Sequence, residues 1–303
     1  MLFNELLMQN RMKKYLMIIG GMIVLVVIFI VTSKGKQLTN HVKGIIENTI
    51  STPSYINELG DSISTRVELP KGYKRKSYPK GSFQEYLRNY RLKKHGSPII
   101  NYDDTKYFAQ HWHDAILEVP VPANGLQQCA DALMRMRAEY LWDINRKDEI
   151  GFNFTSGHYC SWKKYAEGFR PKIKGNKVTF HKTASSNSSK SNFYKYLNLI
   201  YTYAGTLSLH TELPEVKIKD LTIGDMLVNP GTPGHIEIIV DEIVNERGEK
   251  LFLLAQGNTP AQNVCLLKNF EDTSISPWYK FKENESVYTP SYYFEEALFI
   301  RFK

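Results

Sequence analysis

Three side chains of this 303-residue chain have the types and the order that thiol chemistry requires: Cys129, His235 and Gln256. In such chemistry a thiolate attacks an amide carbonyl, and a neighbouring histidine takes and returns the proton. A third polar group orients the second imidazole nitrogen, and Asn258 is the alternative to Gln256 in that role. Cys129 stands in the first turn of a predicted helix, where the helix dipole favours the thiolate. We therefore expect Cys129 to be the nucleophile, His235 the general base and Gln256 the orienting residue.

Each of these residues also has a purely structural interpretation. Cys129 on an apolar helix face could be a small buried hydrophobic residue, and His235 could cap a turn. Cys160 is a rival nucleophile because His158 stands two residues before it, although neighbours in sequence rarely have the required geometry. Cys265 lies in an apolar run and is expected in the core. No pair of cysteines has metal-ligand spacing, so we expect neither a metal nor a cofactor.

Four further residues are candidates for contacts with substrate: Asp131, Tyr203, Asn258 and Gln262. The amide side chains supply both donors and acceptors, which suits a peptide or a sugar. Asp131 lies one turn beyond Cys129 and could line the same cleft. It also stands four residues before Arg135, and Glu139 follows at the same interval, so an ion-pair ladder is the structural alternative.

The elements that must position these residues follow from apolar periodicity. Residues 126–142 have the helical spacing of apolar side chains. Residues 226–229, 235–241 and 250–256 are typical of strands, and the turn at residues 245–248 indicates a hairpin between the last two. Helical sequence followed by an antiparallel sheet predicts an α+β fold, with an insertion near residues 143–220.

Other local signals define the flanking elements. Ser82 begins a capping-box pattern for a helix that reaches about Tyr90. A second helix is expected from Phe193 to Tyr203, with Asn192 as its N-cap. The last strand is expected at residues 297–302.

The N-terminal region indicates a membrane anchor. Residues 15–32 carry no charge and are long enough to span a bilayer. Lys13 and Lys14 precede them, which places residues 1–14 in the cytoplasm and the rest outside. The run is longer than a signal-peptide core and lacks a good cleavage site, which favours an uncleaved anchor over a removed signal. Met12 is an alternative start.

The predicted organisation is therefore a transmembrane or signal segment at 15–32, a stalk at 33–65 and one soluble domain at 66–303. The formal net charge of +8 is dispersed, which suits an anionic surface such as a membrane or cell wall. No nucleic-acid-binding motif is present in the sequence, and we expect no nucleic-acid partner. We expect a bacterial envelope protein whose domain faces the periplasm or cell surface, and the sequence does not define its oligomeric state.

Two resemblances add to these inferences. The segments at 129–142, 203–209, 231–241, 253–263 and 276–279 resemble an uncharacterised bacterial family, a domain of unknown function (DUF4846-like). The chain also resembles the NlpC/P60 and CHAP cysteine peptidases and amidases in the order of its motifs: Cys129 comes first, then Gly224-Asp225, then Gly234-His235.

The second resemblance implies a papain-like core, a helix packed on an antiparallel sheet, and cleavage of amide bonds, as in cell-wall peptides. Gln128 and Ala130 flank the cysteine where that group usually has Asp-Cys-Ser-Gly, and the interval from Cys129 to His235 is long. The alternative function is a non-catalytic domain that binds a glycan or peptide and retains the same fold.

Overall fold

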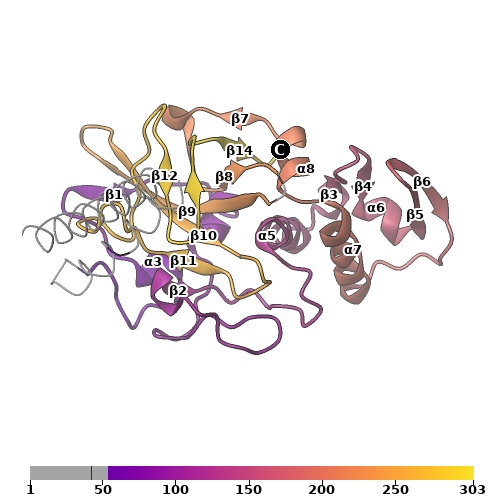
Figure 1. Ribbon diagram of the computed structural model, residues 1–303, viewed down its shortest axis with the longest axis horizontal. Helices are drawn as coiled ribbons and strands as arrows, with labels where there is room; N and C mark the ends of the chain where they lie inside the picture. The colour runs from indigo at the N-terminus through magenta and orange to yellow at the C-terminus, as the bar shows by residue number, and fades with distance from the viewer. Residues whose placement is uncertain (1–41, 43–53, 232) are drawn as a thin grey trace, which may run out of the picture.

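The computed structural model describes residue 42, residues 54–231 and residues 233–303 (Figure 1). Within these residues no helix is long and apolar enough to cross a membrane. The expected transmembrane segment at 15–32 and most of the expected stalk lie outside them. Residues 54–65, also expected in the stalk, pack onto the domain: Ile56 pairs with Val67, and Ile63 is fully buried.

The core of the described part is one antiparallel sheet of eight strands. In spatial order the strands are β2 (His113–Ile116), β11 (Cys265–Leu267), β10 (Lys250–Gln256), β9 (His235–Asn245), β8 (Asp225–Asn229), β14 (Phe299–Arg301) and β7 (Glu215–Val216). The eighth, β1 (Tyr73–Arg75), pairs with the end of β9 beyond β8. Because every pair is antiparallel, the expected α+β class is confirmed at this level.

The β9–β10 hairpin is the centre of the sheet. Both strands are rich in Ile, Leu and Val and are buried along most of their length, as in the core of a fold covered on both faces. Gly248 has φ +79°, the left-handed conformation that the connecting turn requires. The pairing shifts register between Leu253 and Leu254, which leaves one extra residue in β9 and changes the face that later side chains point to.

Helix α5 (Cys129–Asp143) packs on β9 and β10, and α7 (Lys190–Tyr203) lies beyond it (Figure 1). The predicted helix at 126–142 is thus confirmed, with its beginning at Cys129. Helix α7 begins three residues before the prediction, because Ser189 is its N-cap and accepts a hydrogen bond from the Asn192 N–H. Asn192 is therefore inside the helix.

The expected insertion contains small elements around α7. They are η2 (Lys147–Glu149), β3 (Gly151–Asn153), β4 (Tyr159–Ser161), α6 (Trp162–Ala166), β5 (Phe169–Lys174), β6 (Lys177–Lys182), α8 (Thr206–Glu212) and η3 (Ile218–Asp220). Strands β3 and β4 form one two-stranded sheet, and β5 and β6 form another. Both lie on the side of α5 away from the main sheet (Figure 1).

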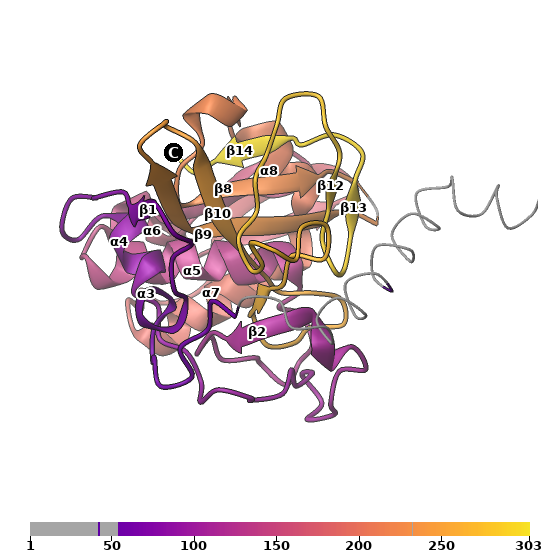
Figure 2. The same cartoon turned by 90° about the vertical axis from the view of Figure 1, so that its left-hand side faces the viewer.

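The N-terminal elements cover one end of the sheet (Figure 2). They are α3 (Ile63–Arg66), β1 and α4 (Phe83–Arg88), and η1 (Gln110–Trp112) precedes β2. Ser82 accepts a hydrogen bond from the Glu85 N–H, which confirms the predicted N-cap of α4.

The C-terminal elements complete the fold. Strands β12 (Val287–Tyr288) and β13 (Tyr293–Phe294) form a small hairpin, and β14 then enters the main sheet. Arg301 of β14 forms two hydrogen bonds with the buried carboxylate of Asp225. The Asp of the Gly224-Asp225 pair is thus bound by Arg301 and anchors the last strand.

Candidate active site around Cys129

The Cys129 side chain lies at the amino-terminal end of α5. Gln128 is the N-cap, so Cys129 is the first helical residue and its backbone N–H has no carbonyl one turn before it. The first bond of the helix ladder runs from the Ala132 N–H to the Gln128 carbonyl. The thiol therefore stands at the positive end of a fifteen-residue helix, where a negative charge is stabilised.

His235, the first residue of β9, lies against this thiol. The Cys129 thiol lies close enough to the His235 imidazole to raise its pKa by hydrogen bonding and charge, although the two residues are 106 apart in the chain. The Tyr292 ring stacks on the imidazole, with 5.1 Å between the ring centroids and 24° between the planes. The imidazole is held in place by these neighbours and is only 4% exposed.

The other side of the imidazole is bound by Gln256 at the end of β10. His235 Nε2 donates to Gln256 Oε1 at 2.6 Å, so Nδ1 is the nitrogen left for the thiol. Gln256 Oε1 also accepts from the Ser291 hydroxyl at 2.6 Å. The structure thus brings together all three side chains that were predicted as nucleophile, base and orienting residue.

Glu237 is a fourth member of this group and was not among the residues predicted from the sequence. Its Oε1 lies 3.5 Å from His235 Nε2 and accepts a hydrogen bond from the Thr289 hydroxyl. Its side chain is fully buried, and Oε2 has no hydrogen-bond partner within the described chain. The sequence did contain a signal for this residue: Glu237 follows His235 by two positions in a predicted strand, and such residues share a face of the sheet.

These contacts decide the charge of the imidazole. Burial acts to lower the pKa of His235, but the hydrogen bonds and charges of Cys129 and Glu237 outweigh it and raise the pKa to about 10. This pKa favours the imidazolium at neutral pH, with the Cys129 sulfur on one side and the Glu237 carboxylate on the other.

A cavity of about 470 Å³ opens above Cys129. Its lining comes from the start of α5, the α7–α8 junction, the β8–β9 turn and the loop after β10, and includes Gln128, Asp131, Thr206, Gly234 and Thr259. This size is in the range of small-ligand sites. Cys129 lines the cavity and is 7% exposed, so a substrate in the cavity would meet the thiol.

Two glycines allow the elements to approach this closely. A Cβ on Gly257 would meet the Ala132 Cβ at 3.0 Å and the Gln128 carbonyl at 3.2 Å. A Cβ on Gly234 would meet the Thr206 hydroxyl at 2.3 Å. The first glycine therefore allows β10 to reach the start of α5, and the second allows the residue before His235 to reach α8.

Asp131 lies in the wall of the cavity, as the sequence analysis expected. Its Oδ2 accepts from the Gln128 N–H and caps the helix, and its Oδ1 is buried without a partner in the described region. Burial raises the pKa of Asp131 to about 7. The Arg135–Glu139 ion pair forms at 2.9 Å, so the expected ladder exists only in its second half.

The other three predicted substrate contacts lie elsewhere. Tyr203 lines a neighbouring cavity with Phe154 and is 39% exposed. Asn258 accepts a hydrogen bond from the Thr259 N–H and is next to the cavity through that residue. Gln262 is 1% exposed and is not in the cavity wall. Tyr201 and Thr259 line the cavity where Tyr203 and Asn258 were expected.

The other two cysteines are buried, and all three are free thiols. Burial raises the pKa of Cys160 and of Cys265 to about 12. Cys265 lies in β11, as expected for a core residue. Within the described residues, no group of three or more His, Cys, Asp and Glu side chains is arranged to hold a metal ion.

The comparisons with known proteins identify one family. The model of a family described as a domain of unknown function (4846) matches residues 63–301, which confirms the first resemblance. The resemblance to NlpC/P60 and CHAP enzymes gains no support from them. No curated protein and no solved structure matches the chain.

Proposed function

Because the chain belongs to the family of domain of unknown function 4846, whose description assigns no activity, we propose a function from the site itself: a cysteine hydrolase that cleaves amide bonds. The observation that carries the proposal is the juxtaposition of Cys129 and His235 at a helix N-terminus, beneath an open cavity. A buried structural cysteine has no need of an imidazolium partner or of access to a cavity.

The first chemical step uses this pair. The thiolate of Cys129 attacks the substrate carbonyl carbon, and the carbonyl electrons move to the oxygen. The unpaired N–H of Cys129 is the nearest fixed donor for this oxyanion, and the helix dipole acts in the same direction. The Gln128 side chain, which is exposed at the cavity, is a second donor within the same turn.

His235 completes the reaction. Its imidazolium gives a proton to the leaving amine, the C–N bond breaks, and a thioester remains on Cys129. Neutral His235 then takes a proton from water while the water oxygen attacks the thioester carbonyl, and the C–S bond breaks, which releases the acid and restores the Cys129 thiolate beside the imidazolium. Gln256 and Glu237 keep the imidazole oriented throughout, because both bind the nitrogen that faces away from the thiol.

The substrate class follows from the expected location. An anchor at residues 15–32 would place the domain outside the cytoplasm, and a net charge of +8 suits an anionic wall. We therefore propose cell-wall peptides as substrates. A helix with Cys129 at its start, packed on an antiparallel sheet that carries His235, also supports the papain-like core that the NlpC/P60 resemblance implied.

The test is thiol labelling combined with cleavage. We expect the native full-length chain to react with iodoacetamide mainly at Cys129 and to release peptide from cell-wall fragments. Cys129→Ala should abolish both signals. Cys160→Ala and Cys265→Ala are matched controls that remove buried thiols, and both should retain labelling and cleavage.

Two outcomes would contradict the proposal. Labelling that persists in Cys129→Ala would show that another thiol is the reactive one. A native thiol that reacts only after unfolding, with no cleavage, would favour the alternative of a domain that binds a glycan or peptide without catalysis.

A further inference from the structure

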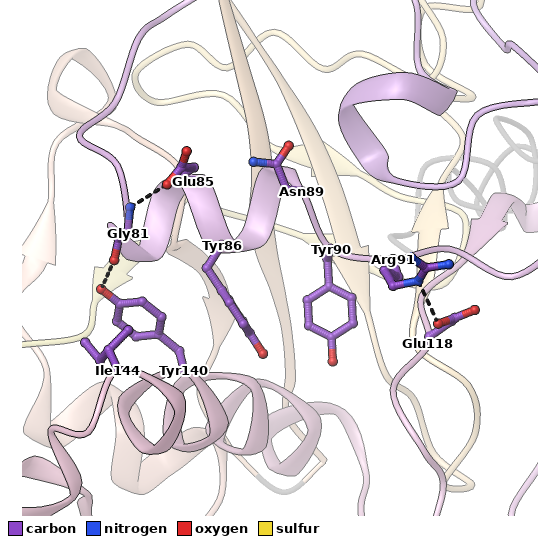
Figure 3. Close-up of a pocket in the computed structure, with 9 residues that line it drawn as sticks. All are labelled: Gly81, Glu85, Tyr86, Asn89, Tyr90, Arg91, Glu118, Tyr140 and Ile144. Carbon is purple, nitrogen blue, oxygen red and sulfur yellow. Dashed lines mark hydrogen bonds and ion pairs between the residues drawn. The ribbon is translucent and has the colours of Figure 1, made fainter.

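A second cavity lies at the other end of α5, between that helix and α4 (Figure 3). Its volume is about 490 Å³, and three tyrosines line it: Tyr86, Tyr90 and Tyr140. Tyr140 follows Cys129 by eleven residues, which corresponds to about 16 Å along a helix. The tyrosine cleft is therefore separate from the cavity above Cys129.

The tyrosine rings face one another across the cleft. Tyr86 and Tyr90 extend from the α4 side toward α5, and Tyr140 rises from α5 to meet them (Figure 3). The ring centroids of Tyr86 and Tyr140 are 5.4 Å apart, and those of Tyr86 and Tyr90 are 5.5 Å apart with perpendicular planes. Tyr140 is buried and donates to the Gly81 carbonyl, so the base of the cleft is rigid.

Polar groups surround these rings. Asn89 uses its carbonyl oxygen to accept from the Ser64 hydroxyl, so its amide nitrogen is the atom left to donate. The Tyr86 and Tyr90 hydroxyls both point toward α5 in the cleft (Figure 3). Burial raises the pKa of both, so they stay neutral and can act as both donors and acceptors.

Three charged side chains line the cleft: Glu85, Arg91 and Glu118. Glu85 accepts from the Gly81 N–H, and Glu118 pairs with Arg91 at 3.5 Å. An anionic ligand would meet two carboxylates and one guanidinium that is already paired, whereas the hydroxyls of a neutral ligand can donate to the carboxylates. A neutral ligand rich in hydroxyls therefore fits the cleft better than an anion.

We propose that the tyrosine cleft binds a neutral sugar, a pyranose ring that carries an acetamido group. The C–H faces of a pyranose are apolar and pack on tyrosine rings, while its hydroxyls need the donors and acceptors that edge this cleft. Ile144, at the Tyr140 end, offers an apolar surface for the acetamido methyl. The inference does not depend on the hydrolase chemistry, because no cleft residue belongs to the group around Cys129.

The test uses tri-N-acetylchitotriose as the probe and isothermal titration of the full-length chain. We expect saturable binding at millimolar or lower concentration. Tyr90→Ala removes one ring and should weaken binding by about tenfold. Tyr90→Phe keeps the ring and should weaken it less. Tyr159→Ala removes an exposed tyrosine outside the cleft and should have no effect.

The outcomes separate this site from the active site. Binding that survives in Cys129→Ala but is weakened in Tyr90→Ala supports the sugar site, whatever the cleavage assay shows. Absence of binding by the native chain would overturn it, and so would binding that Tyr90→Ala leaves unchanged while the variant melts like the native protein.

Discussion

At the scale of single residues, Glu237 acts together with Cys129 to raise the pKa of His235. A fully buried carboxylate is costly unless a positive charge or several hydrogen bonds compensate it, and Glu237 has the Thr289 hydroxyl and the imidazolium. The pKa of His235 in the folded protein, about 10, lies above its unfolded value of 6.5. This charged pair therefore stabilises the fold fully below pH 6.5, and the contribution is lost as the pH rises through 10.

Glu237→Gln tests this reasoning. The variant removes the negative charge but keeps the shape, so the pKa of His235 should fall by about 1–3 units. The alkaline limb of the cleavage profile should then move to lower pH, because the imidazolium protonates the leaving amine. The control is Gln256→Glu, which places a negative charge at the same imidazole nitrogen. This variant should not move the alkaline limb of the cleavage profile to lower pH. If the alkaline limb of Glu237→Gln stays where it is in the native protein, Glu237 does not contribute to the raised pKa of His235.

Among the secondary-structure elements, the site depends on how closely β10 approaches the first turn of α5. Helix α5 presents Cys129 and β9 presents His235, and Gly257 allows the chain after β10 to pass close to Gln128 and Ala132 at the start of α5. The Cβ of an alanine at position 257 would lie only 3.0–3.2 Å from these atoms, which is closer than ordinary van der Waals contact.

Gly257→Ala should therefore separate the helix from the strand. We expect a loss of about 1–3 kcal/mol in the free energy of unfolding, as for other overpacked sites, and cleavage reduced by more than the stability loss explains. Gly205→Ala is the control for stability, because a Cβ there meets nothing within 4 Å and the backbone is extended. Equal melting of the two variants would contradict the close-packing argument.

At the scale of the whole molecule, residues near the start of the domain are joined to the centre of the sheet. Arg75 of β1 and Arg88 of α4 both bind the fully buried carboxylate of Asp241, at 2.7 Å and 2.6 Å. This arrangement ties the N-terminal elements to β9, the strand that carries His235. It agrees with a family match that covers residues 63–301 as one unit.

Asp241→Asn should therefore destabilise the whole domain. Loss of the charge leaves two arginines without their partner, and we expect about 3 kcal/mol less free energy of unfolding in urea. Asp148→Asn is the control, because its ion pair with Lys163 is exposed and should contribute less than about 1 kcal/mol. Similar losses in the two variants would show that the buried pair contributes no more than a surface one.

Local patterns in the sequence were sufficient to predict the main helices and strands. Apolar periodicity defined α5 and the strands β8, β9 and β10, and the capping preference of Ser82 defined α4, because these signals depend on neighbours within a few residues. They did not determine where α7 begins, because Ser189 and Asn192 are both residue types that suit an N-cap. The order of the elements along the chain was enough for the α+β class.

Only the tertiary structure decided which side chains meet. Cys129 and His235 are 106 residues apart, and their contact depends on sheet pairing and helix packing that no local pattern contains. The same holds for Glu237, whose strand face was predictable but whose approach to the imidazole was not. It also holds for the tyrosine cleft, because Tyr86 and Tyr140 come from different helices and form one surface only after those helices pack together.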